Sequence, residues 1–82
     1  NTMTDGESLF LHGNKIAKKD NGKVLFTLAN WPTVTTRERV NGVFRGINSR
    51  YGVSQRAGTQ YLVKDGVEVE PIDDNEWYEV KE

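Results

Sequence analysis

The side chains that could do chemistry fall into two groups of opposite charge. Residues 34–63 carry five arginines against one glutamate, a net charge of +4, and residues 64–82 carry eight carboxylates against two lysines, a net charge of −6. Guanidinium groups bind phosphate and carboxylate, and an acidic run can form an interaction tail or resemble nucleic acid to a basic partner. Alternatively, the two groups pair with each other inside the fold. The basic group is Arg37, Arg39, Arg45, Arg50 and Arg56, with Trp31 before it, and the acidic edge is Glu68, Glu70, Asp73, Asp74 and Glu76.

The sequence contains no pattern that predicts catalysis. His12 is its single imidazole, and a position beside a turn is typical of a surface histidine. It has no nucleophile elbow, Walker loop or dinucleotide fingerprint. The lack of cysteines and of histidine pairs excludes the ordinary zinc sites, and the acidic run lacks the spacing of an EF-hand. We therefore expect a protein that is not an enzyme and has no metal site and no cofactor.

Length and composition predict one small domain. The chain has 82 residues, of which 35% are hydrophobic and 28% charged. Its apolar runs are shorter than the roughly 18 residues of a membrane span, and its polar start does not resemble a secretory signal. We expect a cytoplasmic protein with no membrane partner. Residues 1–6 lack periodicity and are expected to be a disordered segment, with Met3 as the natural start, before a single α+β domain over residues 7–82.

Turn signals divide residues 8–29 into three strands. Gly13-Asn14 suits a type II′ turn, because glycine takes the first positive φ, and Asn21-Gly22 is the strongest short signal for a type I′ turn. The segment therefore predicts a three-stranded antiparallel meander. Its third strand presents alternating apolar side chains on one face: Val24, Phe26 and Leu28.

A helix is predicted over residues 36–50. Thr35 and Glu38 form a capping box, and Gly52 suits the left-handed position after a helix. The apolar residues at helical spacing are Val40, Val43, Phe44, Ile47 and Tyr51.

Two glycines within this predicted helix, Gly42 and Gly46, share one flank with arginines on either side. Each costs a helix roughly 1 kcal/mol relative to alanine. Either a ligand approaches the helix backbone closely there, or a neighbouring segment of the chain packs against it. Both interpretations stay open at this point.

The C-terminal part returns to strands. Residues 59–64 lead through Asp65-Gly66, another type I′ signal, into a strand over 67–70 with valines expected inward and glutamates outward. Residues 77–80 can form a last strand. We predict an α+β fold in βββ-α-βββ order, with one antiparallel sheet of about five or six strands and a single helix packed on one face. The core is completed by Ile16, Leu62 and either Trp77 or Tyr78.

Two stretches resemble small accessory proteins of tailed bacteriophages. Residues 9–17 read LFLHGNKIA, and after a glycine-containing hairpin residues 31–41 read WPTVTTRERVN. The resemblance extends over residues 9–48, although Arg39 stands where many of those proteins carry histidine. It implies a phage origin and a host-cell cytoplasm, and it carries over no catalytic or binding residue.

Two functions stay open. The first is a non-enzymatic phage accessory protein that binds a host or phage protein through an Arg-rich helix face or the acidic C-terminal edge. The alternative is a nucleic-acid-binding module that uses the central arginines, although the pI of about 5.8 is low for such a module. A homodimer could form by pairing of the strand over 67–70 or of the last strand across a two-fold axis.

Overall fold

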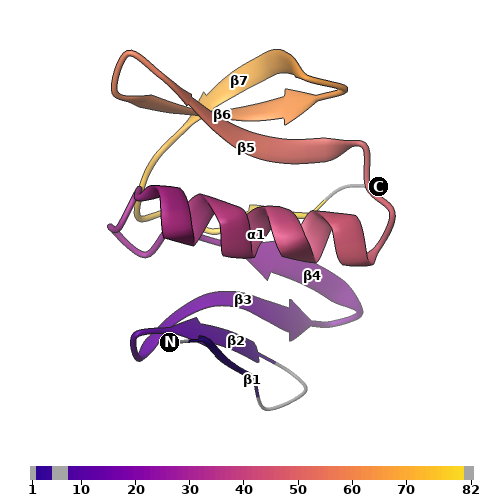
Figure 1. The fold of residues 1–82 in the computed structure, drawn as a ribbon. Coiled ribbons are helices and arrows are strands. Elements are labelled where there is room, and N and C mark those ends of the chain that lie inside the picture. Colours follow the sequence, from indigo (N-terminus) through magenta and orange to yellow (C-terminus); the bar gives the residue numbers. More distant parts are fainter. Residues whose placement is uncertain (1, 5–7, 81–82) are drawn as a thin grey trace.

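The computed structural model describes residues 2–4 and 8–80 and has an α+β fold with one helix between two antiparallel sheets (Figure 1). The first sheet has five strands in the order β1-β2-β3-β4-β8, and the second has three in the order β5-β6-β7. The elements are β1 (Thr2–Thr4), β2 (Ser8–Leu11), β3 (Asn14–Asp20), β4 (Lys23–Phe26), α1 (Val34–Gly46), β5 (Tyr51–Arg56), β6 (Thr59–Lys64), β7 (Val67–Ile72) and β8 (Tyr78–Glu79).

The α+β class is confirmed, but the single sheet of five or six strands is wrong. The strands after the helix pair with one another as a meander, and only β8 returns to the first sheet, where it pairs with β4. The reason is local. Ala57-Gly58 forms a tight turn, so residues 51–56, for which the sequence predicted no strand, form a strand paired with β6. Successive hairpins favour pairing between neighbours in the chain.

The turns follow their signals at two of the three predicted positions. Asn21-Gly22 (φ 53° and 80°) and Asp65-Gly66 (φ 52° and 82°) take the positive φ values of type I′ turns. The first hairpin instead turns at His12-Gly13 (φ 51° and 82°), so the type II′ prediction for Gly13-Asn14 is wrong, and Asn14 opens β3.

The helix begins and ends earlier than the predicted 36–50. Thr33, not Thr35, is the N-cap, and its side chain accepts a hydrogen bond from the Thr36 N–H at 3.2 Å. At the other end Asn48 (φ 58°), not Gly52, takes the left-handed conformation. The helix therefore stops before Ile47, and Tyr51 belongs to β5.

Two polar side chains of α1 fasten the helix to the second sheet. The Asn41 amide accepts a hydrogen bond from the Val53 N–H (2.7 Å) and donates one to the Val53 carbonyl (3.0 Å). One turn earlier, Arg37 Nη1 lies within hydrogen-bonding distance of the side-chain oxygens of Gln55 (2.7 Å) and Gln60 (3.1 Å). Asn41 thus occupies the edge of β5, where a further strand would otherwise pair.

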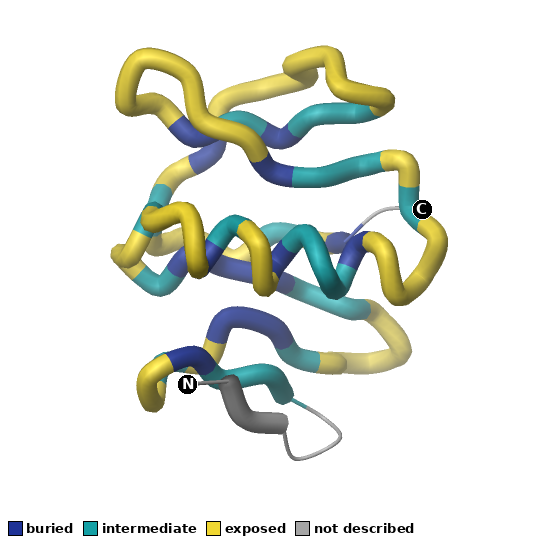
Figure 2. Tube along the Cα trace, viewed as in Figure 1, coloured by how far each residue is buried: buried dark blue, intermediate teal, exposed yellow. Residues whose placement is uncertain are grey.

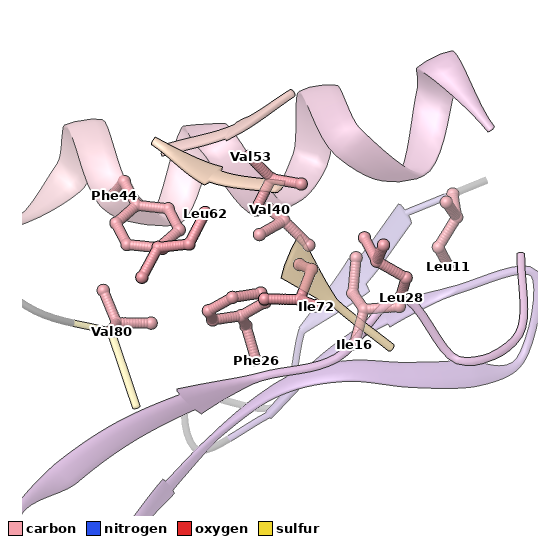
Figure 3. Packing of buried hydrophobic residues seen from close by; sticks show 10 residues of the cluster. All are labelled: Leu11, Ile16, Phe26, Leu28, Val40, Phe44, Val53, Leu62, Ile72 and Val80. Atoms are coloured by element: carbon pink, nitrogen blue, oxygen red, sulfur yellow. The ribbon is translucent and has the colours of Figure 1, made fainter. Parts of the chain in front are cut away.

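The core lies where α1 meets both sheets (Figure 3). Phe44 packs edge-on against Phe26, with ring centroids 5.3 Å apart, and the centroid of the Tyr78 ring lies 5.7 Å from that of Phe26. Of the predicted core, Ile47 and Trp77 are exposed, whereas Val24, Val43 and Tyr51 are half-buried around its margin. The buried cluster is Leu11, Ile16, Phe26, Leu28, Val40, Phe44, Val53, Leu62, Ile72 and Val80.

The outer strand of the second sheet is exposed along most of its length (Figure 2). Val67 is 68% exposed and Val69 54%, so the prediction that they point inward is wrong. The helix packs against β5, and within this sheet β7 is the strand on the opposite edge. The helix therefore does not cover Val67 and Val69.

The N-terminal segment also differs from expectation. Thr2–Thr4 form β1, which pairs antiparallel with β2, where a disordered segment over 1–6 was expected. The other residues of that segment lie outside the described residues.

Two glycine substitutions test how tightly α1 is fastened. A Cβ at Gly52 would lie 3.0 Å from Asn41 Oδ1, and Asn41 is fixed by its two hydrogen bonds. We expect Gly52→Ala to lower the free energy of unfolding by about 1 kcal/mol. A Cβ at Gly42 would meet only the Arg45 guanidinium at 3.8 Å, so Gly42→Ala should raise it by up to about 1 kcal/mol.

Urea unfolding of both variants measures these changes. If Gly52→Ala were as stable as the wild type, the close approach between β5 and Asn41 would be contradicted.

Candidate functional site

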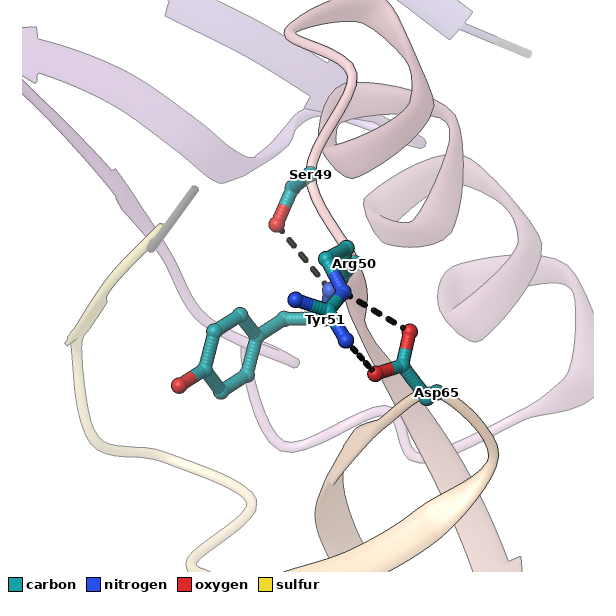
Figure 4. Close-up of polar contacts among 4 residues, drawn as sticks. All are labelled: Ser49, Arg50, Tyr51 and Asp65. Atoms are coloured by element: carbon teal, nitrogen blue, oxygen red, sulfur yellow. Dashed lines mark hydrogen bonds and ion pairs between the residues drawn. The ribbon is translucent and has the colours of Figure 1, made fainter.

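Two of the predicted binding arginines pair with carboxylates of the acidic C-terminal part. Arg50 forms a bidentate ion pair with Asp65 (Figure 4), in which Nε donates to Oδ1 at 3.1 Å and Nη2 donates to Oδ2. Arg56 holds Glu68 in the same manner, at 2.7 and 3.0 Å, and its guanidinium lies 5.2 Å from the centre of the Tyr61 ring. Part of the charge asymmetry is therefore neutralised within the second sheet.

The five arginines do not gather on one face. Arg37 is engaged with Gln55 and Gln60, while Arg39 and Arg45 are exposed on the helix. Arg50 and Arg56 lie at opposite ends of β5. A strand of six residues is roughly 20 Å long, so the two guanidinium groups belong to separate parts of the surface. The structure does bring Arg45 and Arg50 to one shallow hollow of about 210 Å³ beside Gly52 and Val63.

The flank that carries the helix glycines is open. Nothing lies within 4 Å of a Cβ built at Gly46, and Gly42 meets only Arg45. No neighbouring described segment therefore accounts for these two glycines, and the approach of a ligand to this flank stays a prediction.

Among the described residues, the acidic edge contains most of the carboxylates that have no ion pair. Glu68 is held by Arg56, whereas Glu70, Asp73, Asp74 and Glu76 have no ion pair with any described residue. The loop after β7 is fixed to the rest of the fold, because the Asn30 N–H donates to the Asp74 carbonyl at 2.8 Å and the Asp73 N–H donates to the Tyr78 hydroxyl at 2.7 Å. The acidic edge thus continues from the outer strand to the loop that precedes α1.

The backbone of β7 also has groups that point outward. Since Asn41 bonds the N–H and C=O of Val53, these groups point away from β6, and the ladder alternation then directs those of Leu62 toward Glu70 in β7. The pairing then steps from Leu62–Glu70 to Val63–Glu68, so β7 has an extra residue at Val69. Because the groups of Val63 point toward β5, the N–H and C=O of Glu68 opposite it point away from the sheet. Pro71, which has no N–H, occupies the other outward position. The outer edge therefore offers hydrogen-bonding groups chiefly at Glu68.

Trp31 lies at a pocket of about 430 Å³ between the start of α1, the loop before it and the β2–β3 turn, and no arginine lines this pocket. Its indole is 60% exposed. Sequence reasoning selected Trp31 but missed the pocket, since the residues that face it come from three separate segments. They are Leu11, His12, Asn14, Ile16, Leu28, Ala29, Trp31, Thr33, Thr35 and Thr36.

Within the described residues, no three His, Asp or Glu side chains lie close enough together to hold a metal ion. Over the same residues, the structure contains no helix with the length and apolar character needed to cross a membrane.

The fold and this surface define a small two-sheet α+β protein whose candidate site consists of charged and aromatic surface side chains. The chain belongs to the Kyanoviridae Gp96 protein family, a family of cyanophage proteins, because the family model matches residues 1–81. The phage origin implied by the resemblance over residues 9–48 is confirmed. Neither the comparison with curated proteins nor that with solved structures gives a match.

The ion pairs make a testable prediction about titration. The hydrogen bonds from Arg56, together with its charge, lower the pKa of Glu68, and Arg50 lowers the pKa of Asp65 in the same way. We expect Arg56→Gln to raise the pKa of Glu68 toward its ordinary value and to leave the pKa of Asp65 unchanged. The reciprocal control, Arg50→Gln, should raise the pKa of Asp65 and leave that of Glu68 unchanged. Carboxyl carbon NMR measures both.

The sign of the effect on stability follows from the lowered pKa values. Each pair stabilises the fold above the ordinary carboxylate pKa, and this contribution is lost as the pH falls through the lowered, folded-state pKa. Because both pairs are exposed, the contribution is small. If Glu68 titrated identically in the wild type and in Arg56→Gln, the ion pair would be contradicted.

Proposed function

We propose that this phage protein is a non-enzymatic accessory protein that binds a basic, extended segment of another protein along β7. The observation that carries the proposal is the open outer edge of the second sheet. The inner edge, β5, is occupied by Asn41, whereas no described strand covers β7. Extended peptides bind to such edges by adding a strand, with backbone hydrogen bonds and side-chain contacts together supplying the affinity.

The side chains of β7 favour a segment in which basic residues alternate with β-branched residues. Val67 and Val69 offer exposed apolar surface on the strand, and the Glu70 carboxylate has no ion pair with a described residue. Asp73 and Glu76 extend the negative charge beyond the end of the strand. Lysine or arginine side chains of the partner would lie near these carboxylates. We therefore expect charge attraction to speed the association and added salt to weaken it.

The same charges disfavour a second copy of the chain as the partner. Antiparallel self-pairing of β7 about Val69 would set Glu68 opposite Glu70 of the other copy. Like charges directly opposite each other destabilise a strand pair. Pro71 removes a donor from the edge as well, as in strands protected against self-association. The homodimer that the sequence left open is thus the less favourable use of this edge.

The nucleic-acid alternative stays a prediction and has less support than the acidic edge. Arg50 and Arg56 already hold carboxylates, and Arg37 holds two glutamine side chains. Phosphate binding by these arginines would have to break intramolecular contacts. For this reason the acidic edge, rather than these three arginines, is our choice of binding surface.

A titration with a synthetic peptide tests the proposal. We expect an eight-residue peptide of alternating lysine and threonine to shift the amide NMR signals of β7, and binding to weaken as salt is added. Glu70→Lys should weaken binding at least tenfold, because an attractive charge becomes repulsive. The matched control, Glu38→Lys, makes the same charge change on exposed helix surface and should alter affinity by less than twofold.

A glutamate–threonine peptide of the same length provides the charge control and should not bind. The proposal is wrong if the basic peptide leaves the β7 signals unmoved, or if Glu70→Lys and Glu38→Lys weaken binding equally.

A further inference from the structure

The pocket at the start of α1 is separate from the acidic edge and has a different chemistry. We propose that it binds a small, neutral, planar heteroaromatic ligand against the indole of Trp31. At about 430 Å³ the pocket lies within the size range of small-molecule sites. The proposal does not depend on the function assigned to β7, and the two can fail independently.

An apolar floor and an aromatic wall give the pocket its shape. Leu11, Ile16 and Leu28 are buried members of the core and close the bottom. Trp31 is 60% exposed although its side chain is the largest that lines the pocket. An exposed indole over an apolar floor favours a flat ring, since stacked aromatic pairs gain energy beyond the area that they bury.

The backbone holds Trp31 in place at a cost. Ala29 (φ 53°) and Asn30 (φ 62°) are both left-handed, a conformation that is strained for alanine. Hydrogen bonds fix this loop: the Ala29 N–H donates to Thr27 Oγ1 (3.2 Å), and the Trp31 N–H donates to the Leu28 carbonyl (2.8 Å). The indole is thus presented by a rigid, strained turn, as is common for residues of binding sites.

The rim offers hydrogen bonds without fixed charge. The Asn14 amide, the Thr35 hydroxyl and the His12 imidazole line the pocket, and none has a hydrogen-bond partner among the described side chains and backbone. The described lining includes no lysine, arginine, aspartate or glutamate. A charged ligand would lose hydration here without gaining a counter-charge. A neutral ring with polar atoms at its edge fits both the floor and the rim.

Benzimidazole and indene are matched probes, because they have the same shape and indene lacks the two nitrogens. We expect benzimidazole to shift the amide NMR signals of residues 11–14 and 28–36, and indene to bind several-fold more weakly. Trp31→Ala should weaken benzimidazole binding tenfold or more, as expected for the loss of a stacking platform. Asn14→Ala should weaken the binding of benzimidazole and leave the binding of indene unchanged. The two affinities should therefore lie closer together in this variant than in the wild type.

Trp77→Ala is the control, because Trp77 is also exposed but packs on Lys18, outside the pocket lining. This variant should bind benzimidazole as the wild type does. The proposal is overturned if neither probe shifts these signals up to its solubility limit, if Trp31→Ala and Trp77→Ala bind alike, or if indene binds as tightly as benzimidazole.

Discussion

The side-chain amide of Asn41 joins the helix to the second sheet through two hydrogen bonds to Val53, and much of the architecture depends on this contact. An asparagine amide has one donor and one acceptor side, so it can bond the N–H and C=O of one residue much as a neighbouring strand would. It thereby closes the β5 edge, which a second strand would otherwise extend. Gly52 has no Cβ, so its strand can lie close to the Asn41 side chain. Val40 and Phe44 of the same helix pack into the core.

The consequence is an asymmetric sheet. One edge is closed from within the chain, and the other, β7, faces solvent with exposed valines and unpaired carboxylates. Arg56 neutralises Glu68 but leaves Glu70, so the outer edge keeps negative charge at the position where a partner strand would lie. At the start of α1, the pocket that Trp31 lines lies between the first sheet and the loop before the helix.

Local signals predicted the local structure. Asn21-Gly22 and Asp65-Gly66 formed the expected turns, and the apolar spacing of Val40 and Phe44 identified the buried helix face. Ala57-Gly58 was missed because alanine rarely adopts positive φ, and with it β5 and the division into two sheets. Thr33 and Thr35 both offer a hydroxyl for capping, and only the fold selects Thr33. Trp31 and Glu70 were selected from the sequence, whereas the pocket and the open edge depend on tertiary contacts between distant segments.

Native-state hydrogen exchange at two amides tests the central claim most directly. The Val53 and Glu68 N–H groups both point away from β6, and they differ in that Asn41 covers only the first. We predict that the Val53 amide exchanges as slowly as the amides bonded between β5 and β6, while the Glu68 amide exchanges quickly. If Val53 exchanged as fast as Glu68, the Asn41 contact would not hold the helix to this sheet, and the account would be contradicted.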